Sequence, residues 1–193
     1  MKNYDVIVIG TGGATIVADA AIATGKKVAI IEKGKFGGTC LTRGCIPTKV
    51  MVTVADAVRE IEELPKIGVK VQPATIDWDL MSKRVWHKID ESKGVEAYYD
   101  KFDSVDLYRG AATFVRDKVL KVTLKDGSVT DEITAPIIVL GVGGHTKINP
   151  IKGLEEAGYM SSESLFGDKY PKKPFKSLVV MGGGPIGTEF AHV

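Results

Sequence analysis

Residues 4–32, "YDVIVIGTGGATIVADAAIATGKKVAIIE", predict the fold of the chain. The apolar run at 4–9 is typical of a buried strand, and the Ala-rich stretch that follows predicts a helix ending at Gly25. Residues 26–32 predict a second buried strand, which ends at Glu32. Strand, Gly-rich turn, helix and strand make a βαβ unit, so we expect an α/β fold with a Rossmann-like nucleotide-binding domain.

The Gly-rich turn of this unit predicts a dinucleotide site. Gly10 permits a tight turn, and Gly12 lets the backbone approach a pyrophosphate at the positive end of the helix. Glu32 lies 22 positions after Gly10 (32 − 10), where a carboxylate can accept hydrogen bonds from ribose hydroxyls. Thr15 occupies the third glycine position, so we expect the helix to stand slightly farther from the strand. An ordinary βαβ unit with a Gly-rich turn is the alternative.

Composition excludes several classes of function. The 193 residues are 44% hydrophobic and 26% charged with a net charge of +2, and basic and acidic residues are mixed along the chain. This balance indicates neither a nucleic-acid-binding arm nor a membrane-surface helix. The N-terminus lacks the apolar region of a signal peptide, and no apolar run reaches the length of a membrane span. We therefore expect a cytoplasmic protein that binds neither nucleic acid nor membranes.

Both cysteines, Cys40 and Cys45, lie in residues 37–49, "GGTCLTRGCIPTK". A structural disulfide, half of a metal site, two inert buried thiols and a redox pair are the alternatives. A reducing cytosol does not maintain structural disulfides. A zinc site needs four ligands at short paired spacings, and the three histidines are remote in sequence; they are His87, His145 and His192. We therefore expect no metal and favour a redox pair.

The surroundings of the cysteines also favour redox chemistry. The pattern after residue 39 becomes helical, with Pro47 near a first helical turn. A cysteine at a helix N-terminus, with Arg43 and Lys49 close in sequence, has a stabilised thiolate and is reactive.

A dinucleotide βαβ unit followed at once by "GGTCLTRGCIPTK" resembles the FAD-dependent pyridine nucleotide–disulfide oxidoreductases. The resemblance covers the whole chain and implies bound FAD, with NAD(P) in the complete enzyme. Cys40 resembles the thiol that exchanges with the substrate, and Cys45 the thiol that meets the flavin and forms the charge-transfer species. Lys49 matches the lysine beside flavin N5, and Glu189 matches the glutamate that pairs with that lysine.

The resemblance also implies a set of nucleotide contacts. Residues expected to contact FAD are Gly10, Thr11, Gly12, Gly13, Glu32, Lys33, Gly38, Thr39, Lys49, Ala112 and Gly143. Residues expected to contact NAD(P) are Gly182, Gly184 and Gly187, which have the full fingerprint spacing. One stretch departs from the family: "IIVLGVGG" has Gly141 and Val142 where the family has Ala and Thr.

The rest of the chain predicts helices over most of 50–103, then an antiparallel β-meander inserted into the Rossmann-like domain. We expect the N-terminal part of an FAD domain at 1–148, a connector at 149–176, and the start of a second, incomplete nucleotide domain at 177–193 with a strand at 177–181. A dinucleotide βαβ unit needs about thirty residues, so the sequence looks like part of a longer enzyme.

The resemblance implies a homodimeric enzyme that passes electrons between NAD(P)H, FAD and the Cys40–Cys45 disulfide, to or from a small dithiol or disulfide. The dihydrolipoamide dehydrogenase branch is the nearest in pattern, with a protein-bound lipoyl group as a candidate partner. Pro185 resembles the mercuric reductase-like branch. Another disulfide reductase, or a non-catalytic FAD-binding piece, is the alternative. We expect the 193 residues alone to be inactive.

Overall fold

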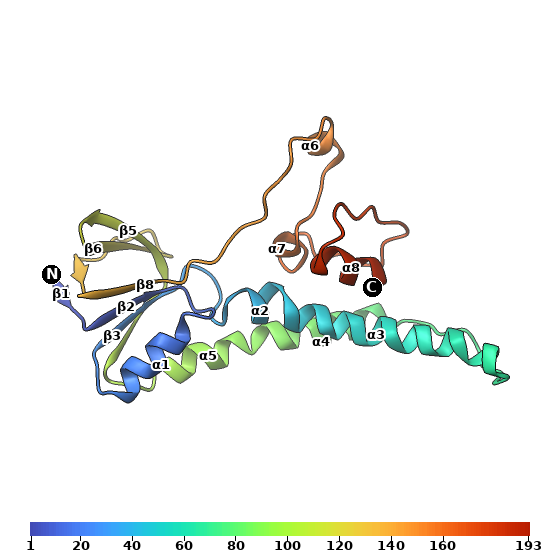
Figure 1. Cartoon of the computed structure of the whole chain (residues 1–193), viewed down its shortest axis with the longest axis horizontal. Helices are drawn as coiled ribbons and strands as arrows, with labels where there is room; N and C mark the ends of the chain where they lie inside the picture. Colours follow the sequence, from blue (N-terminus) through green and yellow to red (C-terminus); the bar gives the residue numbers. More distant parts are fainter. The chain divides into compact units, whose positions relative to one another are not determined.

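The computed structural model describes residues 1–193 and divides into two compact units (Figure 1). Unit 1 comprises residues 1–40 and 91–145, and unit 2 comprises residues 41–90 and 146–193. Each unit is built from two separate segments of the chain. The domain assignment made from the sequence stays a prediction.

Unit 1 contains a four-stranded parallel sheet in the order β4–β3–β2–β8. Its strands are β2 (Val6–Ile9), β3 (Val28–Ile31), β4 (Val105–Tyr108) and β8 (Ile137–Leu140). The two central strands are almost entirely buried because both faces of the sheet are covered. Helix α1 (Thr15–Ala23) connects β2 to β3, as the βαβ pattern predicts.

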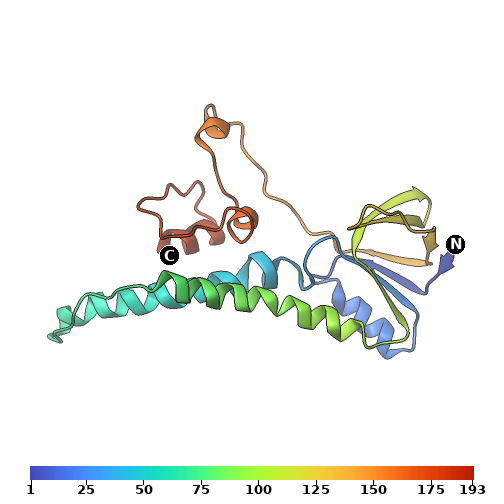
Figure 2. The same ribbon diagram turned by 180° about the vertical axis from the view of Figure 1, so that it is seen from behind.

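Alternate side chains of these strands enter two different cores. Val8 and Ile30 pack with Ala18 of α1 and Tyr99 of α5 (Ser92–Tyr99) on one face. On the other face, residues such as Ile7 pack against a second sheet. The parallel sheet therefore lies between a helical layer and a second sheet (Figures 1 and 2).

The second sheet has the strand order β1–β7–β6–β5 and contains the predicted meander. Its strands are β1 (Lys2–Asn3), β5 (Gly110–Arg116), β6 (Val119–Leu124) and β7 (Ile133–Thr134). β5 pairs antiparallel with β6, and β6 pairs antiparallel with β7, while β1 adds a parallel edge. The α/β fold with an inserted antiparallel meander is thus confirmed.

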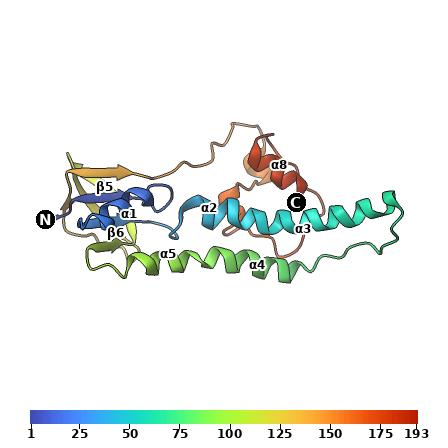
Figure 3. The same cartoon turned by 60° about the horizontal axis from the view of Figure 1, so that its bottom comes forward.

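Unit 2 is mainly helical. Helix α2 (Gly38–Arg43) begins in unit 1, and α3 (Cys45–Glu63) and the 3₁₀-helix Leu64–Ile67 follow it. Helices α3 and α4 (Trp78–Asp90) run side by side in opposite directions (Figure 3). Met51 of α3 packs with Val85 of α4 in a core that also includes Leu165 and Phe166. The remaining helices are α6 (Leu154–Ala157), α7 (Ser162–Leu165) and α8 (Pro185–His192).

The strand predicted at 177–181 is absent, so that prediction was wrong. These residues have no regular secondary structure, and Val179 is 86% exposed. An apolar β-branched run becomes a strand only where a neighbouring strand takes its N–H and C=O groups and another layer covers its side chains. Neither is present around this run, although the following helix α8 does form.

None of the helices combines the length and apolar character that a bilayer-spanning helix requires.

Candidate functional site

The loop between β2 and α1 turns as tightly as its glycines predict. Gly10 has φ +99°, a left-handed conformation that disfavours other residues. A Cβ at Gly10 would lie 2.1 Å from the carbonyl oxygen of Gly141, immediately after β8. Both the conformation and the lack of space require glycine at this position.

Glu32 holds this loop in place from the end of β3. Its Oε2 accepts hydrogen bonds from the backbone N–H of Thr11 at 3.0 Å and from the Thr11 hydroxyl at 2.8 Å. Its Oε1 accepts a third from the N–H of Gly34 at 2.7 Å. Thr11 is only 2% exposed. The carboxylate predicted to bind ribose therefore also orders the loop predicted to bind phosphate.

The start of helix α2 lies against the same loop. A Cβ at Gly38 would lie 2.5 Å from the Cα of Gly12, and Gly38 has φ +65°. The neighbouring Gly37 donates its N–H to the Thr11 hydroxyl at 3.0 Å. The helix that carries Cys40 thus begins in contact with the dinucleotide loop.

The loop presents backbone donors at the N-terminus of α1. The N–H groups of Gly12 and Gly13 make no hydrogen bond to another part of the chain. Thr15, at the third glycine position, donates its hydroxyl to the carbonyl of Gly12 at 2.9 Å. Open N–H groups at a helix N-terminus beside a close-packed glycine loop fit the pyrophosphate of a dinucleotide.

Gly141 and Ala14 explain one departure from the family pattern. A Cβ at Gly141 would lie 2.3 Å from the Cβ of Ala14. The alanine that the family has at position 141 would therefore collide with Ala14. The glycine keeps β8 close to the dinucleotide loop, and its N–H bonds the carbonyl of Ile9 at 2.8 Å.

The two cysteines lie on consecutive helices. Cys40 is within α2, Gly44 separates the helices, and Cys45 is the first residue of α3. Both side chains are exposed thiols in this structure. Cys45 therefore lies at the N-terminus of α3.

Lys49, in the second turn of α3, forms an ion pair with Glu189 of α8. The side chains come from positions 140 apart in the sequence. A ring contact between Phe166 and Phe190, with centroids 6.0 Å apart, also holds α8 in unit 2. The two residues that the family resemblance pairs are therefore in contact.

A second ion pair at the redox segment, residues 37–49, was not predicted. Arg43, at the end of α2, pairs with Glu163 of α7. Ser161 caps α7 through a capping box with Ser164. The "SSES" pattern could have indicated a helix start there, but nothing in the sequence indicates which cation Glu163 contacts.

The other predicted contact residues lie at several places. Lys33 and Thr39 are exposed, Ala112 is half-buried in β5, and Gly143 follows β8 with φ +67°. Gly182 has φ +119°, Gly184 caps α8, and a Cβ at Gly187 would lie 2.2 Å from the carbonyl oxygen of Gly182. This second glycine loop makes a tight turn into its helix although no strand precedes it.

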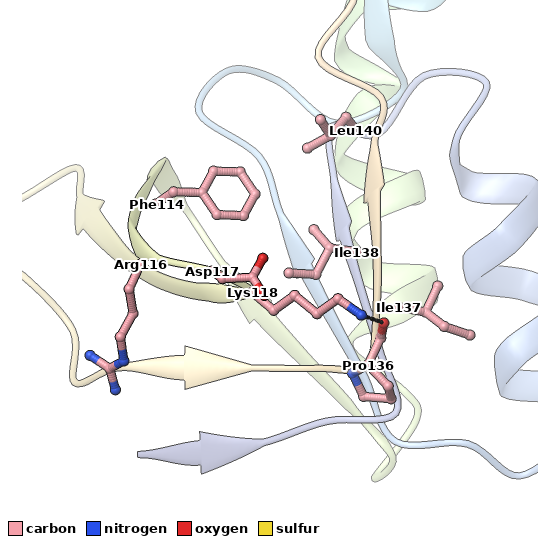
Figure 4. Close-up of a pocket in the computed structure, with 8 residues that line it drawn as sticks. All are labelled: Phe114, Arg116, Asp117, Lys118, Pro136, Ile137, Ile138 and Leu140. Carbon is pink, nitrogen blue, oxygen red and sulfur yellow. Dashed lines mark hydrogen bonds between the residues drawn. The ribbon is translucent and has the colours of Figure 1, made fainter.

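A pocket of about 610 Å³ lies elsewhere in unit 1, between the β5–β6 hairpin and β8 (Figure 4). Phe114, Ile138 and Leu140 give it an apolar wall, and Lys118 donates to the carbonyl of Pro136 at 3.0 Å. None of the residues predicted to bind a nucleotide or to carry out redox chemistry lines it.

Comparison with known proteins shows the family of the chain. A family model described as pyridine nucleotide-disulphide oxidoreductase matches residues 4–193. The chain is 32% identical over 194 aligned positions to a mycothione reductase of Mycobacterium tuberculosis, covering 100% of the chain and 41% of that protein. It is 35% identical to a dihydrolipoyl dehydrogenase of Chlorobaculum parvum, covering 98% of the chain and 40% of that protein.

A mercuric reductase of Bacillus cereus is 30% identical to the chain, over 99% of the chain and 29% of that protein. The chain thus spans about two-fifths or less of the length of these curated relatives.

Proposed function

Because the chain belongs to the pyridine nucleotide-disulphide oxidoreductase family, we propose that it carries the FAD-binding loop and redox dithiol of a flavoprotein disulfide oxidoreductase. One observation supports this proposal most strongly. Gly38, the first residue of the helix that bears Cys40, packs against Gly12 of the dinucleotide loop. A nucleotide bound on that loop is therefore next to the start of the thiol-bearing helix.

Each residue of the loop has a proposed part in holding FAD. Glu32 accepts hydrogen bonds from the ribose hydroxyls, and the N–H groups of Gly12 and Gly13 donate to the pyrophosphate. Gly10 keeps the turn tight, and Gly38 leaves room for the backbone of the loop. Bound FAD supplies a two-electron carrier between a nicotinamide and the dithiol.

The remaining contacts predicted from the family resemblance are part of the same proposal. Those for FAD are Thr11, Lys33, Thr39, Ala112 and Gly143. Those for the nicotinamide nucleotide are Gly182, Gly184 and Gly187, where a glycine turn enters α8. The domain limits, a homodimer and a cytoplasmic location belong to the proposal too.

The proposed chemistry is dithiol–disulfide exchange. Oxidation of a substrate dithiol by the Cys40–Cys45 disulfide forms the substrate disulfide and leaves two cysteine thiols, so electrons and protons balance. Cys40 exchanges with the substrate, and Cys45 is the thiol nearer the flavin. Lys49 lies one turn after Cys45 and is held there by its ion pair with Glu189.

Dihydrolipoamide is the substrate we propose first, in agreement with relatives named dihydrolipoyl dehydrogenase. A protein-bound lipoyl group is a candidate partner. Mercuric ion and mycothione are the alternatives, because relatives at similar identity are named mercuric reductase and mycothione reductase. A non-catalytic FAD-binding role is the remaining alternative.

The test has two stages. The visible spectrum of the protein, loaded with FAD and then desalted, reports whether flavin is held. NADH oxidation by the whole protein is then measured separately with lipoamide, with mycothione and with Hg²⁺. Retained flavin with turnover on one acceptor supports the enzyme and names its substrate, whereas retained flavin without turnover on any acceptor supports the non-catalytic role.

A further inference from the structure

Both cations of the redox segment are matched by glutamates from the C-terminal part of the chain. Arg43 lies two positions before Cys45 and pairs with Glu163, and Lys49 lies four positions after Cys45 and pairs with Glu189. The Lys49 pair is the one that the family resemblance implies. The Arg43 pair is a separate contact, on the other side of the thiol in sequence.

Glu163 reaches Arg43 from an anchored turn. Ser161 caps α7, and its backbone and side chain bond those of Ser164 in both directions. The next two residues, Leu165 and Phe166, are 7% and 5% exposed in the core that includes Met51 of α3. The short helix that presents Glu163 is therefore fixed to the same helix that begins with Cys45.

Arg43 and Cys45 are close neighbours along the backbone. Two consecutive Cα–Cα steps span at most about 7.6 Å, so the two backbones lie within about one Debye length at physiological ionic strength. A nearby cation stabilises a thiolate, which is the nucleophilic form of cysteine. A carboxylate paired with that cation offsets this effect.

We propose that the Arg43–Glu163 ion pair tunes the redox segment, with Glu163 as a positioning residue that holds the Arg43 charge and thereby limits the reactivity of Cys45. This inference rests on the proposed function only in taking Cys45 as a redox thiol. Surface ion pairs contribute modestly, so the effect is a moderate adjustment rather than an on–off switch.

The first test measures alkylation of Cys45 by iodoacetamide at pH 7 in the full chain carrying Cys40→Ser, which leaves one thiol. Glu163→Gln is expected to raise the alkylation rate about two- to fivefold, and Arg43→Gln to lower it by a similar factor. The double variant should alkylate like Arg43→Gln alone, because Glu163 acts through Arg43. Glu163→Asp, which keeps the charge, should stay nearer the parent rate.

The second test measures the dithiol–disulfide reduction potential of the chain with both cysteines, against glutathione. Glu163→Gln should shift the potential to a more positive value, because an uncompensated Arg43 stabilises the reduced, thiolate-bearing form. A merely structural role would not move the potential in opposite directions for Glu163→Gln and Arg43→Gln.

An unchanged alkylation rate in Glu163→Gln would overturn the inference. The inference would also be overturned if Glu163→Gln raised the alkylation rate of the Arg43→Gln variant. Neither measurement needs bound flavin or turnover, so failure here is distinguishable from failure of the proposed function, which the flavin spectrum reports.

Discussion

The carboxylate of Glu32 accepts hydrogen bonds from both the backbone N–H and the hydroxyl of Thr11, at 3.0 and 2.8 Å. This contact joins the last residue of the βαβ unit to its first turn, across 21 positions of sequence. Because a ribose is expected at Glu32, the side chain that orders the loop is also a proposed ligand contact. Removing the carboxylate should therefore loosen the loop as well as delete a ligand contact.

Substitution of Gly38 tests the contact between the dinucleotide loop and the thiol-bearing helix. In Gly38→Ala the new methyl group would lie 2.5 Å from the Cα of Gly12, at a backbone φ of +65°. We expect the free energy of unfolding to fall by more than about 1 kcal/mol, and bound FAD to be weakened, because the loop must move. Urea denaturation and FAD titration measure the two effects.

Gly94→Ala is the matched control for this variant. Gly94 lies in α5, and a Cβ there meets nothing within 4 Å. Alanine in a helix interior should leave stability unchanged or raise it by up to about 1 kcal/mol. Equal losses in Gly38→Ala and Gly94→Ala would contradict the assigned contact.

The two cysteines should differ in their effect on bound flavin. In the FAD-loaded whole protein, the parent should develop a long-wavelength absorption band on two-electron reduction of its disulfide, whereas Cys40→Ser should show that band while its flavin is oxidised, because Cys45 remains as a thiolate beside it. Cys45→Ser should lose that band. If Cys45→Ser showed the band and Cys40→Ser lacked it, the roles proposed for the two cysteines would be reversed.

Acid should weaken unit 1 through Asp106. Burial alone would raise the pKa of this carboxyl, but hydrogen bonds from Lys2 and Tyr4 and the charges of Lys2 and Lys27 hold the pKa below its ordinary value of 3.8. A carboxyl group with a lowered pKa stabilises the folded state above its unfolded pKa, and this contribution is lost as the pH falls through the folded pKa.

The unfolding free energy of the parent chain and of Asp106→Asn should therefore differ most above about pH 4 and converge at lower pH. Asp103→Asn, at an exposed position, serves as the control. Denaturant unfolding followed by circular dichroism at a series of pH values checks this expectation. If the difference in unfolding free energy between the parent and Asp106→Asn grew on acidification, the expected direction of the pH dependence would be wrong.

The 193-residue chain on its own should not reduce disulfides with NAD(P)H. The glycine turn at Gly182–Gly187 enters α8 without a strand at 177–181, so the proposed second nucleotide site has no sheet beneath it. The assay is NADH oxidation with lipoamide by the purified, FAD-loaded 193-residue chain. Turnover at an ordinary enzyme rate, above about 1 per second, would contradict the expectation.

Local pattern was enough to predict the first βαβ unit. Gly10, Gly12 and Glu32 act within about thirty residues, where strand, turn and helix preferences agree, and the structure folds them together. The antiparallel meander was also accessible, because the turn residues at 125–127 separate two β-type runs.

Contacts between distant segments were not accessible from local pattern. Glu163 and Arg43 are 120 positions apart, and nothing in either segment specifies the other. Whether Gly38 lies against Gly12 depends on the path of the chain after β3, which local pattern does not specify. The prediction of a strand at 177–181 was wrong for the opposite reason. The run has a strong local preference for β structure, but no neighbouring strand pairs with it.

The most direct test of the account is an FAD titration of the apoprotein, comparing the parent chain with Glu32→Ala and Glu32→Gln by quenching of flavin fluorescence. The parent should bind one FAD, and ADP should compete for the site because the adenosine half is what the loop holds. Glu32→Ala should weaken binding by about 1–3 kcal/mol, with Glu32→Gln between it and the parent. Flavin affinity that is the same in all three proteins, or no saturable binding by the parent, would contradict the central claim.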